Sequence, residues 1–327
     1  MSIKQDEIRT YNLALKTVED TNKRLYALYK ESLRKAENEI ISMQMKLLRD
    51  GKISPYKEAR LVNLINKIKD EIKVLRTKSD RIVQSGYIEN YERTYYYQSF
   101  SIEKAINIKS DISYFLNTPE LNKDVIMASF NKRVAGTIFR DRTLRTQREM
   151  QYLIQDAVAQ NVIEGQSVKS LAKNLDLIND VYEKGLGNTT TIARTELLKA
   201  YSIGNDTARI EAEKAGVEFA YEWNAALDGK TRIDHAMADK QKAIIIDGQP
   251  IFNVGGVQFI APRMPLVETG SKAEAGQVIN CRCMRLDLPF GVEPTTRIAK
   301  KASGEWETVN SNITAKEWTE KEYGKSY

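Results

Sequence analysis

The chain has 327 residues, of which 42% are hydrophobic and 29% are charged, and its formal net charge is +6. This length is sufficient for two domains of ordinary size, each with its own core. No apolar run approaches the roughly 20 residues that a membrane-spanning helix requires, and the charged N-terminus lacks the apolar segment of a signal peptide. We therefore expect a protein that crosses no membrane and folds in a reducing cytoplasm.

The positive charge is concentrated in the N-terminal half. Residues 1–150 hold 29 Lys and Arg against 20 Asp and Glu, whereas residues 151–327 hold 21 against 24. A basic region of this kind favours an anionic partner, such as nucleic acid or an acidic protein surface. A well-solvated helical face would give the same excess, so both interpretations stay open.

Residues 1–190 are predicted to form a mainly α-helical, basic region. From Ile3 to about Leu48 the chain has no proline or glycine and repeats apolar residues at helical spacing, which predicts one or two long helices. Ser54 as N-cap and Pro55 as first helical residue mark the start of the next helix. The apolar stripe of that helix suits packing against an antiparallel neighbour; it consists of Leu61, Leu64, Ile65, Ile68, Ile72 and Leu75.

Two side-chain patterns in this region bear on binding. Tyr87, Tyr91 and Tyr95 fall four apart on one helical face, which favours a core or helix interface, with base stacking as the alternative. An arginine cluster further along could bind phosphates or a partner's carboxylates, or form a solvated face with local ion pairs. Its members are Arg140, Arg142, Arg145 and Arg148. We find no zinc finger, RNA-recognition signature or helix-turn-helix.

A Gly/Asn/Thr-rich run, "GLGNTTT", is interpreted as a linker before the helix that begins near residue 192. This helix carries small residues along one face, which lets another backbone approach closely. They include Ala193, Ala200, Gly204 and Ala208.

Beyond this helix the period changes to that of strands. "VEFAYEW" alternates, and "AIIIDGQPIF" and "NVGGVQFIAP" place strands around Asp-Gly and Gly-Gly turns. "QVINCRCMRLDL" is predicted as the last strand, with Asn280 and Arg282 on one side and Cys281 and Cys283 on the other. The predicted fold is α+β: a long-helix region (1–190), a small α+β domain with a short antiparallel sheet (191–290) and a polar C-terminal tail (291–327) that contains Trp306 and Trp318.

The single histidine, His235, lies among Asp228, Asp234 and Asp239. Three carboxylates and an imidazole could hold a divalent cation or support metal-assisted phosphodiester cleavage. Such a segment more often makes turn and capping hydrogen bonds. We find no Gly-rich phosphate loop, which argues against nucleotide hydrolysis.

The only two cysteines, Cys281 and Cys283, allow three interpretations. A disulfide is disfavoured, because residues two apart on a strand are too far from each other. A zinc site completed by His235 and one aspartate is chemically allowed. We prefer two buried thiols that act as small hydrophobic groups, and we therefore expect no metal and no cofactor.

Four short motifs occur in a specific order: "IARTE" at 192–196, Trp223, "LDGKTRIDH" at 227–235 and "VINCRC" at 278–283. Together they resemble the Mu F-like minor head proteins of tailed bacteriophages, most strongly over residues 160–285. The signature positions of the family fall on Arg194, Thr195, Glu196, Trp223, Asp228, Thr231, Arg232, His235, Asn280, Cys281, Arg282 and Cys283.

The resemblance implies a minor capsid protein that associates with the portal during procapsid assembly and contacts or accompanies double-stranded DNA during packaging and ejection. Scaffold or major capsid protein are further implied partners. The implied location is the capsid interior near the portal, after assembly in the host cytoplasm. The resemblance implies structural roles for the signature residues and no enzymatic activity.

The chain departs from the family pattern before the cysteines, where "APRMPLVETGSKAEAG" replaces a Pro-Gly-Asp-Pro-like turn. Some relatives carry an attached toxin, for which we expect the C-terminal tail to be too short. The alternative hypothesis is a metal-dependent enzyme that acts on nucleic acid through Asp228, His235 and Asp239.

Overall fold

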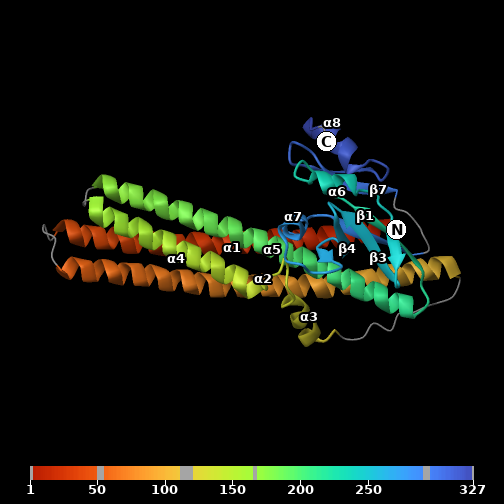
Figure 1. Cartoon of the computed structure of the whole chain (residues 1–327), viewed down its shortest axis with the longest axis horizontal. Helices are drawn as coiled ribbons and strands as arrows, with labels where there is room; N and C mark the ends of the chain where they lie inside the picture. Colours follow the sequence, from red (N-terminus) through yellow and green to blue (C-terminus); the bar gives the residue numbers. More distant parts are fainter. Residues whose placement is uncertain (1–2, 50–54, 111–120, 165–167, 290–294, 326–327) are drawn as a thin grey trace. The chain divides into compact units, whose positions relative to one another are not determined.

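The computed structural model describes residues 3–49, 55–110, 121–164, 168–289 and 295–325 (Figure 1). The N-terminal part is helical: α1 (Ile3–Arg49), α2 (Pro55–Ser110), α3 (Lys123–Phe130), α4 (Phe139–Glu164) and α5 (Val168–Lys214). The C-terminal part mixes short strands and helices: β1 (Phe219–Asn224), α6 (Ile233–Met237), β2 (Ile244–Ile246), β3 (Gln249–Val254), β4 (Val257–Ala261), β5 (Met264–Pro265), α7 (Lys272–Val278), β6 (Met284–Pro289), β7 (Thr296–Lys300), β8 (Trp306–Asn310) and α8 (Ala315–Tyr323).

The α+β class predicted from the sequence is confirmed. The first long helix is continuous over Ile3–Arg49, and the second begins at Pro55 as predicted. The proposed N-cap Ser54 lies outside the described residues. Among the described helices, none combines the length and the apolar character needed to cross a membrane.

Two compact units alternate along the chain. Unit 1 comprises Met1–Val18, Gly86–Ile138 and Arg194–Tyr327, and unit 2 comprises Glu19–Ser85 and Phe139–Ala193. Helices α1, α2 and α5 each contribute residues to both units. These units are interleaved along the sequence, and the domain boundary at residues 190 and 191 stays a prediction.

The predicted linker "GLGNTTT" is instead part of α5. A Cβ atom added at Gly185 would lie 2.4 Å from the Met150 Sδ atom of α4. Glycine at this position therefore permits close helix packing. The sequence pattern had suggested a linker because glycine also favours turns.

The core of unit 2 is formed by apolar stripes on the four helical segments within it. Leu64, Ile68, Ile72 and Leu75 of α2 are buried, which confirms the predicted stripe at these positions. The core also contains Tyr29, Ala36 and Ile40 of α1, Met150 and Ile154 of α4, and Ile178, Val181 and Tyr182 of α5.

The tyrosine face of α2 belongs to unit 1 and is buried, as predicted. The hydroxyl groups of Tyr87 and Tyr91 are hydrogen bonded to Ser129 Oγ (2.9 Å) and Thr207 Oγ1 (3.0 Å). Tyr95 donates to Glu211 Oε2 at 2.5 Å. These rings therefore pack between helices and are not exposed for base stacking.

Short antiparallel sheets surround a second core in unit 1. β1 pairs with β6, β7 pairs with β8, and the remaining strands follow the order β2-β3-β4-β5. The predicted Asp-Gly turn joins β2 to β3, with Asp247 and Gly248 at φ angles of 50° and 74°, as the left-handed hairpin turn requires. Trp223 of β1 lies fully buried among the apolar residues of this core.

The prediction of a strand through both cysteines is wrong. Residues Lys272–Val278 form α7, and β6 begins only at Met284. Ser271 caps the helix by accepting from the Glu274 N–H, and the Ser-x-x-Glu spacing is a local helix-start pattern. Asn280, at φ 60°, then adopts a left-handed conformation that no regular strand contains.

The segment predicted as a polar tail contributes to the same core. Ala299 of β7 and Ala315 and Trp318 of α8 are buried in the core around Trp223. The Trp318 indole donates to the Lys300 carbonyl at 3.0 Å. Trp306, by contrast, is 57% exposed.

We predict that Gly204→Val destabilises the protein by about 1–3 kcal/mol. A Cβ at Gly204 of α5 would lie 2.7 Å from the Tyr91 carbonyl oxygen of α2, a backbone atom that cannot move aside without shifting the helix. The matched variant is Gly187→Ala in the same helix, where an added Cβ meets nothing within 4 Å. Urea denaturation should show loss for the first and a slight gain for the second; equal stability of the two would contradict close packing at Gly204.

Candidate functional site

The family-signature residues in unit 1 converge on the loop of residues 279–283. Two residues of α5 hold its left-handed residue: Arg194 Nη1 donates to Asn280 Oδ1 at 2.6 Å, and the Asn280 backbone N–H donates to Thr195 Oγ1 at 2.9 Å. A non-glycine residue adopts positive φ at an energetic cost. These two hydrogen bonds offset that cost.

Two arginines bind the backbone of the same loop. Arg232 donates to the carbonyl oxygens of Gln277 and Ile279. Arg263 Nη1 donates to the carbonyl oxygens of Cys281 (3.0 Å) and Cys283 (2.9 Å). Sequence reasoning did not find Arg263, although an arginine between two nearby prolines in "APRMP" was a visible departure from the family pattern. Arg263 is 2% exposed, so its guanidinium group contacts the loop and not solvent.

Asp228 organises the turn that precedes α6. Its Oδ1 accepts from the Lys230 N–H at 2.9 Å, from Thr231 Oγ1 at 3.2 Å and from Arg282 Nη2 at 2.8 Å. Thr231 also donates to the Ala226 carbonyl at 2.5 Å. Asp228 and Thr231 therefore couple this turn to the loop through Arg282.

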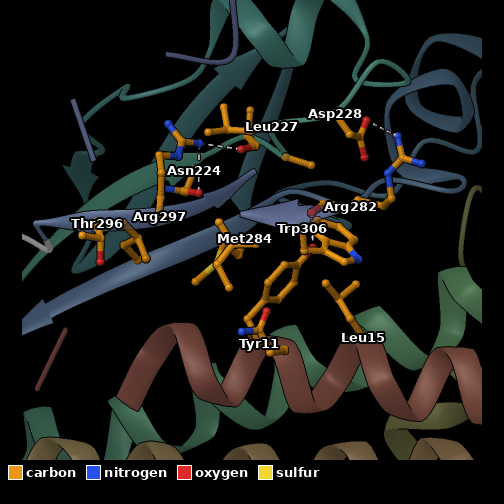
Figure 2. A pocket seen from close by; sticks show the side chains of 15 residues that line it. Tyr11, Leu15, Asn224, Leu227, Asp228, Arg282, Met284, Thr296, Arg297 and Trp306 are labelled. Atoms are coloured by element: carbon orange, nitrogen blue, oxygen red, sulfur yellow. Dashed lines mark hydrogen bonds and ion pairs between the residues drawn. The ribbon is translucent and has the colours of Figure 1, made fainter. Parts of the chain in front are cut away.

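A small cavity borders the pair of Asp228 and Arg282 (Figure 2). Tyr11 and Leu15 of α1, Met284 of β6 and Trp306 of β8 lie around it. Its volume of about 60 Å³ is well below the roughly 300–1,000 Å³ of sites for organic ligands. This cavity is too small for a substrate of ordinary size.

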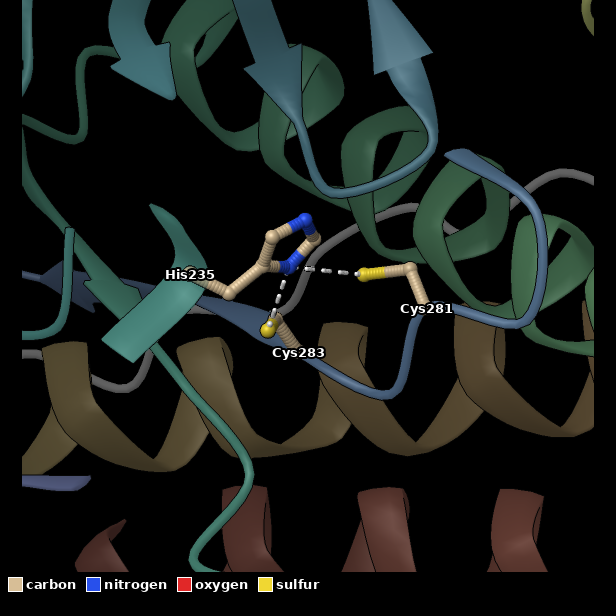
Figure 3. A group of neighbouring side chains, drawn as sticks. All are labelled: His235, Cys281 and Cys283. Carbon is tan, nitrogen blue, oxygen red and sulfur yellow. Dashed lines mark hydrogen bonds between the residues drawn. The ribbon is translucent and has the colours of Figure 1, made fainter. Parts of the chain in front are cut away.

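His235 faces both cysteines (Figure 3). Its Nδ1 atom lies 3.2 Å from Cys283 Sγ and 3.6 Å from Cys281 Sγ. Each of the three residues is 2% exposed. The Trp223 ring packs edge-on against the imidazole, with 5.8 Å between ring centroids. The cysteines are free and buried, as preferred from the sequence, but they lie on a loop.

The pKa values of the two thiols are shifted in opposite directions. Burial raises the pKa of Cys281, but hydrogen bonds with Cys283 and His235 and the charge of Arg263 outweigh it, so this pKa lies well below its usual value. Burial and the neighbouring Cys281 together raise the pKa of Cys283 well above its usual value. Cys281 is therefore the more acidic of the two thiols.

The structure does not bring Asp228, His235 and Asp239 together as one catalytic group. The carboxylate of Asp239 accepts from the backbone N–H groups of Ala225 (2.8 Å) and Ala315 (2.7 Å) and pairs with Arg297 at 2.8 Å. In the described part of the chain, the only group of potential metal ligands around His235 consists of His235, Cys281 and Cys283. These contacts argue against the predicted nuclease alternative.

The remaining signature positions also have structural contacts. Glu196 is fully buried and pairs with Lys199 at 3.3 Å, and Lys199 also donates to the Lys132 carbonyl at 3.0 Å. The arginine cluster lies elsewhere, on α4 in unit 2. Arg140, Arg145 and Arg148 are exposed there, and Arg142 is half-buried.

Asp239→Ala is expected to destabilise the protein by about 3–5 kcal/mol, because it leaves Arg297 buried without its carboxylate partner. The control is Asp180→Ala on α5, where the side chain is exposed and the change should stay within about 0.5 kcal/mol. Chemical denaturation compares them. A fully stable Asp239→Ala protein would contradict this structural role and return Asp239 to the candidates for catalysis.

Comparison with known proteins agrees with the motifs. The family model described as phage Mu protein F like protein matches residues 153–286, a range that contains every signature position. An "NAD(+)--arginine ADP-ribosyltransferase EFV" of Enterococcus faecalis (strain ATCC 700802 / V583) is 24% identical over 290 residues. The match covers 84% of this chain and 56% of the relative, so the chain spans little more than half of the relative's length. No solved structure matches the chain.

Proposed function

We propose that this chain, whose residues 153–286 are Mu F-like, is a minor head protein of a tailed bacteriophage that associates with the portal during procapsid assembly. The family match favours a phage head protein. Portal association goes beyond that match and is our proposal. The observation that supports a structural role is the use of the signature side chains. They bind one another and the backbone of residues 279–283, in or around a buried core.

The activity in the name of the Enterococcus relative belongs to a protein of which 56% is matched. At 24% identity the match transfers no catalytic residue to a position in this chain. The cavity beside Arg282 is small, and Asp228 and Asp239 are engaged by backbone and arginine donors. These features favour assembly over catalysis.

An exposed apolar strand offers a contact surface for assembly. β2 is the terminal strand in the order β2-β3-β4-β5, and its residues Ile244, Ile245 and Ile246 are 68%, 54% and 48% exposed. Successive strand side chains point to opposite faces, so both faces of β2 are uncovered. Exposed apolar edge strands tend to pair with other chains. We assign the portal contact to this strand.

The test is co-expression of the full chain with the portal protein of the same phage, followed by sedimentation. We expect the two proteins to sediment together at a defined mass ratio. Ile245→Asp should abolish this association, because a carboxylate in an apolar contact is costly to desolvate. Val125→Asp on α3 is the matched control, since Val125 is 58% exposed and Ile245 is 54% exposed.

Separate migration of a folded wild-type chain would contradict the proposed association. If Ile245→Asp still co-sedimented, the contact would lie outside β2. A chain that migrated alone and transferred ADP-ribose from NAD to arginine would instead have the activity named for the relative.

The proposal includes contact with double-stranded DNA through the exposed arginines of α4. The combined variant Arg140→Gln, Arg145→Gln and Arg148→Gln should flatten the dependence of log K on log salt by about 0.9 for each lost phosphate contact. Fluorescence anisotropy with duplex DNA at several salt concentrations measures this slope.

The matched control for DNA binding removes three exposed charges from α1 in the same unit: Arg24→Gln, Lys30→Gln and Arg34→Gln. It should leave most of the slope intact. Equal losses in both variants would show that only overall charge matters, and absence of DNA binding by the wild type would remove this part of the proposal.

A further inference from the structure

The geometry points to a buried zinc site: we propose that His235, Cys281 and Cys283 bind Zn²⁺. One ligand atom from each residue lies within 4.8 Å of the other two. Two sulfurs and an imidazole are a ligand set that suits zinc, whereas magnesium and calcium prefer oxygen. The sequence allowed a zinc site with His235 but favoured two buried thiols, because it did not show that His235 lies beside the cysteines.

The distances fit a tetrahedral ion. With Zn–S bonds of about 2.3 Å and Zn–N bonds of about 2.0–2.1 Å, tetrahedral zinc holds nitrogen and sulfur about 3.6 Å apart. Nδ1 of His235 lies 3.6 Å from one sulfur and 3.2 Å from the other. A tetrahedral ion here requires Cys283 Sγ to lie about 0.4 Å farther from Nδ1 than it does in the metal-free site.

The hydrogen bonds of Gln277 place the imidazole in the tautomer that a metal requires. The Gln277 amide nitrogen donates to Asp234 Oδ2 at 2.6 Å, so its Oε1 is the atom that faces His235 Nε2 at 2.9 Å. Nε2 must then carry a proton, so Nδ1, the ring nitrogen that faces the two sulfurs, is the atom available to ligate a metal (Figure 3). Metal-binding histidines are commonly oriented in this way by a polar group on the other nitrogen.

Donors also surround the sulfurs. Arg263 Nη1 lies 3.7 Å from Cys281 Sγ, and the Ala226 backbone donates to Cys283. Donors of this kind stabilise thiolates, the ligating form of cysteine. Zinc binds the thiolate form of cysteine, so binding of Zn²⁺ releases the protons that the two thiols carry and forms two Zn–S bonds.

The aspartate that the sequence suggested as a further ligand is used elsewhere. Asp228 binds Arg282, Asp239 binds Arg297, and Asp234 accepts from Gln277. Three protein ligands remain, and in zinc sites of this type a water molecule completes the tetrahedron. The ion would link α6 to the loop of residues 279–283.

The first test is the zinc content of the full chain, purified under reducing conditions without chelators. Elemental analysis should find about one zinc per chain. Replacement by Co²⁺ should give thiolate-to-cobalt charge-transfer absorption, which Cys283→Ser should weaken or remove. A zinc-free protein that, when reduced, binds neither Zn²⁺ nor Co²⁺ would overturn the proposal.

Because Cys283→Ser could unfold the chain, a second variant leaves all three ligands in place. Gln277→Ala should lower Zn²⁺ affinity about 10–100-fold by releasing the imidazole, measured by competition with a chromogenic chelator. Gln258→Ala on β4, where the side chain is exposed, is the matched control and should bind as the wild type does. Equal affinity of Gln277→Ala and Gln258→Ala would contradict the predicted orientation of His235. None of these measurements depends on portal association.

Discussion

The loop of residues 279–283 is the constraint on which the C-terminal part of unit 1 depends. It begins where α7 ends and must adopt a left-handed backbone at Asn280 before β6 can start. Such a conformation is stable only when its surroundings compensate for it. Here α5 supplies Arg194 and Thr195, and the segment after β4 supplies Arg263. Residues far apart in sequence thus cooperate to position two cysteines beside the single histidine.

Buried charges extend this organisation beyond the loop. Arg285 of β6 is buried between Asp287 of the same strand and Asp206 of α5, with nitrogen–oxygen distances of 2.5 and 2.9 Å. Burial raises the pKa of Asp206, whereas Arg285 and Arg209 lower it by a larger amount, so the pKa of Asp206 lies below its usual value. A lowered folded-state pKa stabilises the fold at neutral pH and loses that contribution as acid protonates the carboxyl. The pair of Arg285 and Asp206 also joins β6 to α5.

The hydrogen bonds of the signature residues explain why these residue types occur at their positions. Arginine is suited to bind several carbonyl groups at once, and threonine and aspartate are suited to turns and caps. In this chain they join α5, the turn before α6 and the cysteine loop. The exposed isoleucines of β2 lie outside this network and leave an edge available for another chain. Under the proposed function, this apolar edge is the surface that contacts the portal.

The sequence by itself determined the long helices, the buried faces of α2 and α5, the hairpin at Asp247 and Gly248, and the Mu F-like family of residues 153–286. These features depend on local periodicity, turn preferences and motif order. Tertiary structure decided that Gly185 packs against Met150, that Cys281 and Cys283 lie on a loop, and that Arg263 and Gln277 complete their surroundings. Each of these depends on contacts between distant segments, which a one-dimensional pattern does not contain. The alternation in "VINCRC" suggested a strand, because a pattern of residue types does not contain the contacts with α5 and Arg263. These contacts hold the chain as a loop there.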